Sequence, residues 1–171
     1  MVFQIFPSLC MLLAAAWATA APAPRTGEAA VREASNGVPC FTIAEREEQL
    51  GGAPDFESVT VYDASARPRT RMWTMSMPST RTFPVLFSMC IPYAGRVQSL
   101  PQTKAAMLEA GKVYEVVIDV RGGQGPATRS RPRGYGARFC LAKQRDGTVI
   151  VHHIGVDAQE GRNLYGCVVQ K

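Results

Sequence analysis

The segment 108–120, LEAGKVYEVVIDV, constrains the fold more than any other part of the chain. Its second half alternates, with Val116, Ile118 and Val120 on one side and mostly polar side chains on the other. A period of two residues is typical of a β-strand with one buried face. Gly111 lies where the chain must turn before this strand. The segment therefore predicts a tight turn that leads into a central strand.

The tyrosine at the start of this strand adds a second constraint. Tyr114 is on the same side as Val116, and Leu108 lies six residues before it with Gly111 in between. This spacing resembles the tyrosine corner of immunoglobulin-like and fibronectin-type sandwiches, in which the ring is buried and the hydroxyl bonds back to the preceding turn. The resemblance implies an all-β fold, an immunoglobulin-like antiparallel β-sandwich of about seven to eight strands.

Other alternating segments supply the remaining strands. They lie at residues 38–44, 57–63, 69–77, 135–143, 148–154 and 164–170, with one or two short strands within 82–93. In the segment 69–77, the alternation predicts that Arg71, Trp73 and Met75 share one face. Trp73 is expected to fill the centre of the core, as a large aromatic often does in sandwiches. Asp146-Gly147 predicts a hairpin between the strands on either side of it.

The first twenty residues differ from the rest of the chain. They contain no charged side chain and end in Ala18-Thr19-Ala20, an A-x-A cleavage signal. We therefore expect residues 1–20 to be a secretory signal peptide. Residues 21–36, rich in alanine, proline and charge, are expected to be a flexible leader. Residues 37–171 are then a single β-sandwich domain.

Two alternatives for the N-terminal segment stay open. An uncleaved membrane anchor would need about 20 apolar residues, and the apolar run here has about 15. Lipidation at Cys10 would need a small residue just before the cysteine, and Leu9 occupies that position. Cleavage, with no stable membrane span afterwards, is the favoured interpretation.

Four cysteines follow the signal peptide, at positions Cys40, Cys90, Cys140 and Cys167. An even number of cysteines in an exported chain predicts two disulfides. Metal binding is disfavoured because no pair has C-x-x-C spacing. Four cysteines allow three pairings. Pairing Cys40 with Cys90 and Cys140 with Cys167 is slightly favoured, because both bonds would close loops of moderate length.

Motifs for catalysis or for cofactor binding are absent from the sequence. It contains no G-x-S-x-G, H-E-x-x-H, G-x-G-x-x-G or P-loop. The only histidines, His152 and His153, are neighbours on a predicted strand and would point to opposite faces, so they could not hold one metal ion together. We therefore expect a non-catalytic protein without a cofactor or a metal.

Arginine is the conspicuous surface residue of a chain whose formal net charge is +5. The segment 121–134, RGGQGPATRSRPRG, lacks core-forming residues and predicts an exposed, mobile loop. Arg129, Arg131 and Arg133 in this loop, and Arg138 just after it, are the candidate partner-binding residues. Their planar guanidinium groups can pair with carboxylates bidentately, which suits an acidic protein surface. A solvated loop without a partner is the alternative, and nucleic acid is not expected as a partner of an exported protein.

Three short stretches together resemble a family of small exported bacterial proteins. They are Cys40-Phe41, Cys90-Ile91-Pro92-Tyr93 followed by Gly95, and the segment 108–118 leading to YGARFCL at 135–141. The family is that of the type VI secretion immunity proteins of the periplasm, most of which are lipoproteins. The order and rough spacing of the stretches fit over residues 38–145.

The resemblance implies an immunity role, in which an exported protein binds and blocks a toxin that acts in the periplasm. The partner would be a cognate toxin with an acidic surface, and the protein would be periplasmic or secreted. The alternative is a structural or adhesion module of the cell envelope, which would bind a cell-wall or surface polymer. A hydrolase would instead need a deep pocket with converging polar groups at His152 or His153.

Overall fold

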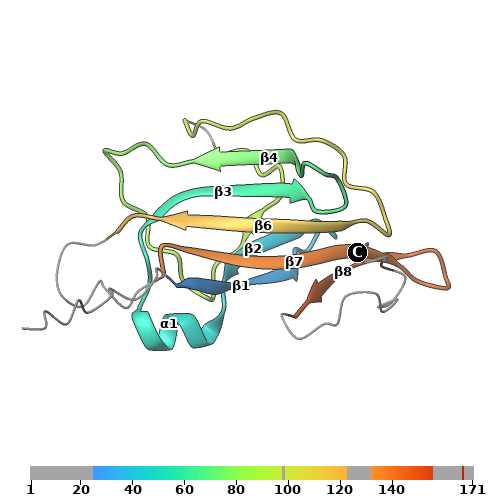
Figure 1. Cartoon of the computed structure of the whole chain (residues 1–171), viewed down its shortest axis with the longest axis horizontal. Helices are drawn as coiled ribbons and strands as arrows, with labels where there is room; N and C mark the ends of the chain where they lie inside the picture. The colour runs from blue at the N-terminus through green and yellow to red at the C-terminus, as the bar shows by residue number, and fades with distance from the viewer. Residues whose placement is uncertain (1–24, 98, 123–131, 156–166, 168–171) are drawn as a thin grey trace, which may run out of the picture.

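The computed structural model describes residues 25–97, 99–122, 132–155 and 167. Within these ranges the protein is mostly β, with eight strands and one short helix. In chain order the elements are β1 (Thr26–Glu33), β2 (Pro39–Ile43), α1 (Glu45–Gly51), β3 (Phe56–Asp63), β4 (Thr70–Ser76), β5 (Ile91–Pro92), β6 (Val113–Val120), β7 (Gly134–Lys143) and β8 (Val149–Ile154) (Figure 1). The predicted signal peptide and, apart from Cys167, the predicted strand 164–170 lie outside the described residues.

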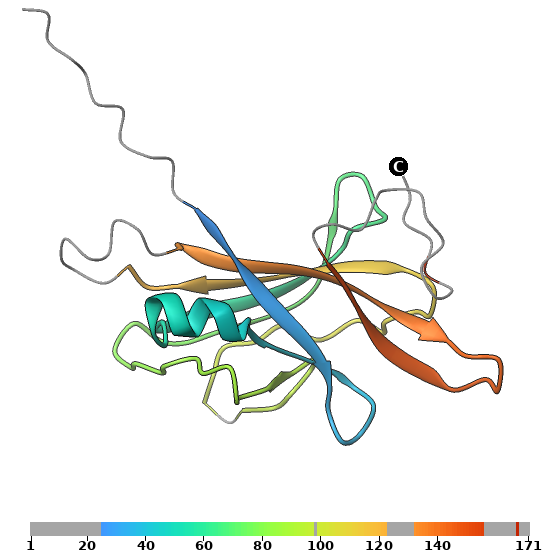
Figure 2. The same cartoon turned by 90° about the horizontal axis from the view of Figure 1, so that it is seen from below.

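The strands form one strongly curled sheet in the order β4-β3-β6-β7-β1-β2-β5, and β8 also pairs with β7. The sheet turns at β1, because residues 26–28 pair with β7 whereas residues 29–33 pair with β2. Figure 2 shows β1 running diagonally across the strands beside it. The two halves of the sheet therefore lie on either side of a common core.

The predicted β class is confirmed, but two details of the prediction are wrong. The sheet is mixed rather than antiparallel, because β1 runs parallel to β7. Thr26–Glu33, expected within the flexible leader 21–36, form β1, so the folded domain begins before residue 37. Glycine and alanine are depleted in strands, which explains why the buried Gly27 and Ala29 gave so weak a signal. The continuous strand order describes a half-barrel, and an immunoglobulin-like sandwich is not clearly formed.

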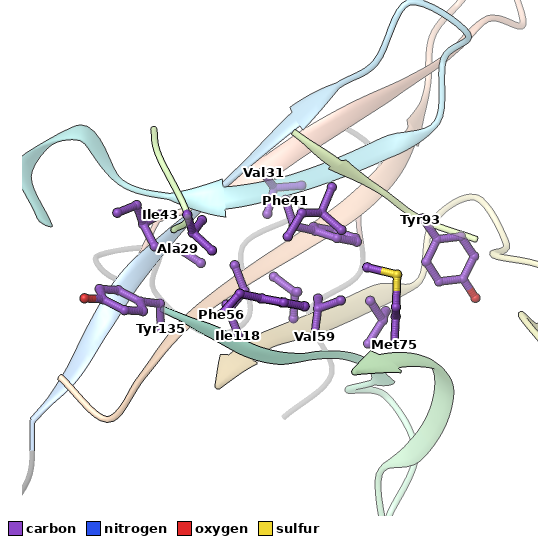
Figure 3. Close-up of a cluster of buried hydrophobic side chains, with 14 of the residues drawn as sticks. Ala29, Val31, Phe41, Ile43, Phe56, Val59, Met75, Tyr93, Ile118 and Tyr135 are labelled. Atoms are coloured by element: carbon purple, nitrogen blue, oxygen red, sulfur yellow. The ribbon is translucent and has the colours of Figure 1, made fainter. Parts of the chain in front are cut away.

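The core lies between the two halves of the sheet, and Figure 3 shows its side chains meeting from both sides. On β6, Tyr114, Val116 and Ile118 are fully buried, which confirms the predicted central strand. Trp73 is only 1% exposed, which confirms its predicted core position. Its ring packs edge-on against Tyr93, with 5.5 Å between the ring centroids. Of the segment 82–93, Ile91–Pro92 forms the one short strand.

A β-bulge in β4 corrects the predicted faces of this strand. Val61 pairs with Trp73, but the next residue of β3, Tyr62, pairs with Arg71, so Met72 is the extra residue. An extra residue reverses the alternation beyond it. Arg71 therefore shares a face with Tyr62 rather than with Trp73, contrary to the prediction.

The cysteines pair as the favoured prediction states. Cys40–Cys90 joins β2 to the segment just before β5, and Cys140–Cys167 joins β7 to the C-terminal part of the chain. Cys140 and Cys167 belong to a second, smaller buried cluster together with Val113, Ala142 and Ile154. Val113 and Cys140 alternate with the core residues Tyr114 and Phe139, so this cluster lies on the other face of the sheet.

Helix α1 is tied to the start of β1 by a nearly buried carboxylate. The guanidinium of Arg25 donates two hydrogen bonds to Glu47, of 2.8 and 2.7 Å, and the backbone N–H of Glu28 donates a third of 3.3 Å. The hydrogen bond from Arg25 is the main reason why the pKa of Glu47 is lowered, against the opposing effect of burial. The pair fixes the segment that leads into β1.

The tyrosine corner is present as predicted. The Tyr114 hydroxyl accepts a hydrogen bond of 2.7 Å from the backbone N–H of Glu109. Gly111 has φ +86°, a conformation that glycine adopts without strain, and Leu108 packs against the core. The hydroxyl therefore joins the buried start of β6 to the turn before it.

Removal of this hydroxyl tests how much the corner contributes. We expect Y114F to lower the free energy of unfolding by about 1–2 kcal/mol, because the ring stays buried while the hydrogen bond to Glu109 is lost. The matched variant Y62F removes a hydroxyl from a partly exposed ring and should change stability by less than about 0.5 kcal/mol. Urea unfolding measures both, and equal effects would contradict a specific role for the corner.

Candidate partner-binding surface

A row of polar and charged side chains crosses the face of the sheet that points away from the core. Strand pairing places Arg71, Tyr62, Glu115 and Arg138 next to one another on β4, β3, β6 and β7. Directly paired residues point to the same face of a sheet. On β6 this face is the outer one, because Glu115 alternates with the buried Tyr114 and Val116.

Arg69 extends this row from the residue before β4. Its guanidinium lies over the Tyr62 ring, 4.4 Å from the centroid, and donates a hydrogen bond of 2.7 Å to the Glu115 carboxylate. We call Arg69, Arg71 and Arg138, with Tyr62 and Glu115, the arginine row. Glu115 balances one of the three arginines. Arg71 and Arg138 are exposed and have no carboxylate partner among the described residues.

The predicted partner-binding residues do not all lie in this row. Arg138 belongs to it, whereas Arg129 and Arg131 lie outside the described residues. Arg133 is exposed and lies five residues before Arg138, which is about 17 Å along an extended strand. There it lines a separate groove of about 620 Å³ that also contains Ser58 and Asp119. The structure thus groups Arg138 with Arg69 and Arg71. The sequence alone does not identify Arg69 and Arg71 as part of this surface, because the bulge at Met72 changes the face on which Arg71 lies.

Arg121, the first residue of the predicted loop 121–134, has a structural role. Its guanidinium donates to the Asp55 carboxylate at 3.2 Å, to the carbonyls of Pro78 and Met77 at 2.8 and 3.2 Å, and to the carbonyl of Arg81. It therefore holds the segment after β4 against the end of β6. A run of arginines in the sequence gives no sign that one of them is used internally.

Substitution of Arg121 should be costly although its side chain is near the surface. We expect R121A to lower the free energy of unfolding by about 2–3 kcal/mol, because it leaves Asp55 and three carbonyls without a charged donor. R121K keeps the charge but loses the planar fork, so it should recover less than half of this loss. Urea unfolding compares these variants with R138A, which should be near neutral. Equal stability of R121A and R138A would contradict the structural role.

His152 and His153 lie on β8, where neighbouring residues point to opposite faces. The Nδ1 atom of His153 accepts a hydrogen bond of 3.4 Å from the backbone N–H of Val31, which links β8 to β1. Burial lowers the pKa of His153, although the nearby Glu28 carboxylate acts in the opposite direction. Among the described residues, no group of three or more His, Cys, Asp or Glu side chains could hold a metal ion.

The lowered pKa of His153 predicts a pH dependence of stability. Below about pH 6.5 the unfolded chain takes up the proton before the folded chain does, so the stability present above this pH is lost as the pH falls towards the lower folded pKa. One proton limits the slope to about 1.4 kcal/mol per pH unit. H153Q should flatten this part of the profile in urea unfolding between pH 5 and 7. An unchanged profile would show that other groups cause the dependence.

The remaining observations concern the setting of the protein. No helix in the described part of the chain is long and apolar enough to cross a membrane. Two disulfides are typical of proteins that fold in an oxidising compartment. Comparison of the chain with protein-family models, with curated proteins and with solved structures finds no match.

Proposed function

We propose that this protein is an exported, non-catalytic binding protein that neutralises a type VI secretion toxin acting in the periplasm. The observation that carries the proposal is the arginine row on the outer face of the sheet. Arginine and tyrosine are the residue types enriched at protein interfaces. Guanidinium groups pair with carboxylates in a planar, bidentate geometry, which suits a toxin with an acidic surface.

The surroundings of the arginine row favour this use. The next row of the same face contains small side chains, with Thr74, Thr60, Val117 and Gly136 in register. On the side of this row, the charged groups of Arg71 and Arg138 therefore extend beyond the neighbouring side chains. They project from strands of a hydrogen-bonded sheet, so little backbone entropy needs to be lost when a partner binds.

The proposed location rests on two features. Residues 1–20 have the composition and cleavage signal of a secretory signal peptide, and the two disulfides suit the oxidising conditions of the periplasm. An immunity protein that meets its toxin outside the cytoplasm needs an export signal, and the disulfides are compatible with that compartment. Lipid anchoring is not part of the proposal.

The test uses the protein encoded by the adjacent reading frame as the probe. If that neighbour is the toxin, the wild-type chain should capture it in pull-down and should protect cells in which it is directed to the periplasm. R71E/R138E should weaken capture by at least about tenfold, because both positions then repel an acidic surface. R145E, which reverses an exposed arginine in the β7–β8 turn, is the matched control and should bind as wild type does.

A third variant separates the two candidate surfaces. R129E/R131E/R133E alters the predicted loop and the groove residue but leaves the arginine row intact. Loss of capture in this variant alone would transfer the interface to the loop. Absence of both capture and protection for the wild-type chain would overturn the proposed function. Binding of the wild type to purified cell-wall polymer would then favour the envelope module.

A further inference from the structure

A second candidate binding site lies at the edge of β4, and no member of the arginine row lines it. The segment 101–106 runs along this edge. Ser76 N–H donates to the Pro101 carbonyl at 2.9 Å, and Thr103 N–H donates to the Thr74 carbonyl at 3.0 Å. Between this segment and residues 94–97 and 99–100 is a cavity of about 730 Å³. Cavities of about 300–1,000 Å³ are typical of sites for small ligands.

The walls of this cavity are held in place by specific contacts. The Tyr93 hydroxyl donates a hydrogen bond of 2.6 Å to the Ala106 carbonyl. A side chain at Gly95 would come within 2.6 Å of the Pro92 ring, so only glycine fits where the wall turns. The N–H of Gly95 donates to the Pro92 carbonyl at 3.0 Å. These contacts therefore fix the backbone segments that form the cavity.

The polar groups of the lining are cations and neutral donors. Arg96 and Lys104 both line the cavity, and neither has a carboxylate partner within the described part of the chain. No aspartate or glutamate is among the described residues that line it, whereas Ser99, Gln102 and Thr103 contribute neutral polar groups. Two uncompensated positive charges at one cavity favour an anion.

Trp73 brings a buried indole to the cavity wall. Its Nε1–H has no hydrogen-bond partner among the described residues, and the Nε1 atom is covered by protein atoms. The indole is therefore a reporter beside the cavity rather than a hydrogen-bond donor to a ligand. The remaining lining is apolar, from Val97, Leu100 and two alanines. The lining thus combines positive charge with apolar surface.

We propose that this cavity binds a carboxylate attached to an apolar group. Arg96 and Lys104 would hold the carboxylate, and Val97 and Leu100 would contact its apolar part beside the Trp73 indole. The same chemistry is offered by a free organic acid and by an acidic side chain of a partner protein. The site is independent of the proposed function, because no member of the arginine row lines it.

The indole N–H of Trp73 provides a direct readout by NMR of the ¹⁵N-labelled chain after removal of the proposed signal peptide. The probe is N-acetyl-phenylalanine, and its neutral amide is the matched control ligand. The acid should shift the Trp73 Nε1–H signal in a saturable way, whereas the amide should not. Trp17, the only other tryptophan, lies within the proposed signal peptide, so the chain without residues 1–20 should show a single indole signal, from Trp73. W73F assigns the signal.

Two variants decide whether the cations are responsible. R96Q/K104Q changes two exposed residues, so the fold should be kept, and it should weaken binding of the acid at least tenfold. R145Q removes an exposed arginine elsewhere and should bind as wild type does. An absent or non-saturable shift, an equal response to the amide, or unchanged binding in R96Q/K104Q would overturn the proposal.

The source of the carboxylate is decided by competition. Saturation of the cavity with the probe should block capture of the adjacent-frame protein if that partner supplies the carboxylate. Unchanged capture together with saturable probe binding supports a free organic acid. The probe titration itself needs no toxin. It therefore tests the cavity even if the proposed function is wrong.

Discussion

The double substitution C40A/C90A is expected to lower the free energy of unfolding by about 4 kcal/mol. The bond closes a sequence separation of 50 residues, and in the chain-entropy model a loop of this length restricts the unfolded state by about that amount. It also joins β2 to the segment before β5, at the end of the strand order where the two-residue β5 has little else to hold it. Urea unfolding without reductant measures the effect.

The second disulfide supplies a matched comparison. C140A/C167A opens a sequence separation of 27 residues, for which the same model gives about 3.5 kcal/mol. Both losses are large against a typical stability of about 5–15 kcal/mol for a domain. A loss below about 1 kcal/mol for C40A/C90A would show that the bond does not constrain the unfolded chain.

Truncation of Phe139 is expected to cost about 3–5 kcal/mol in F139A. Phe139 on β7 is fully buried and packs between two aromatic rings from different parts of the sheet. The ring centroids of Phe41 on β2 and Tyr114 on β6 are each 5.5 Å from that of Phe139. The substitution therefore opens a cavity where the two halves of the sheet meet.

Two controls separate the cavity from other effects. F139L keeps most of the buried volume and should cost less than about 1.5 kcal/mol. V149A shortens a side chain that is 43% exposed and should change stability by less than about 0.5 kcal/mol. Thermal or urea unfolding compares the three variants. A loss in F139A no larger than that in V149A would contradict the central position of Phe139.

The parts of the fold that follow from local periodicity were predictable. Residues 113–120 alternate large apolar and polar side chains, so the central strand and its tyrosine corner are visible in the sequence. β1 was not recognised, because its buried positions are mainly glycine and alanine and its partners lie far away in the chain. The parallel pairing of β1 with β7 leaves no local signal in the sequence. The curled sheet depends on this pairing, so it could not be predicted either.

The candidate surface was only partly predictable for a similar reason. Arg138 was selected because it follows an arginine-rich loop, but its neighbours in space are set by pairing across four strands. The bulge at Met72 moves Arg71 to the outer face, and one extra residue leaves no trace in an alternating sequence. Arg121 shows the reverse case, since the sequence predicts that it lies in an exposed loop, whereas its side chain holds two segments together.

The pairing of β1 has a consequence for the order in which the chain folds. Thr26, near the start of the described chain, pairs with Gly134, so the first strand cannot find its place until most of the polypeptide has emerged. Contacts of such long sequence separation form slowly. If the protein is exported as proposed, late closure keeps the polypeptide unfolded during translocation. Folding is then expected on the far side of the membrane, where the thiols can oxidise.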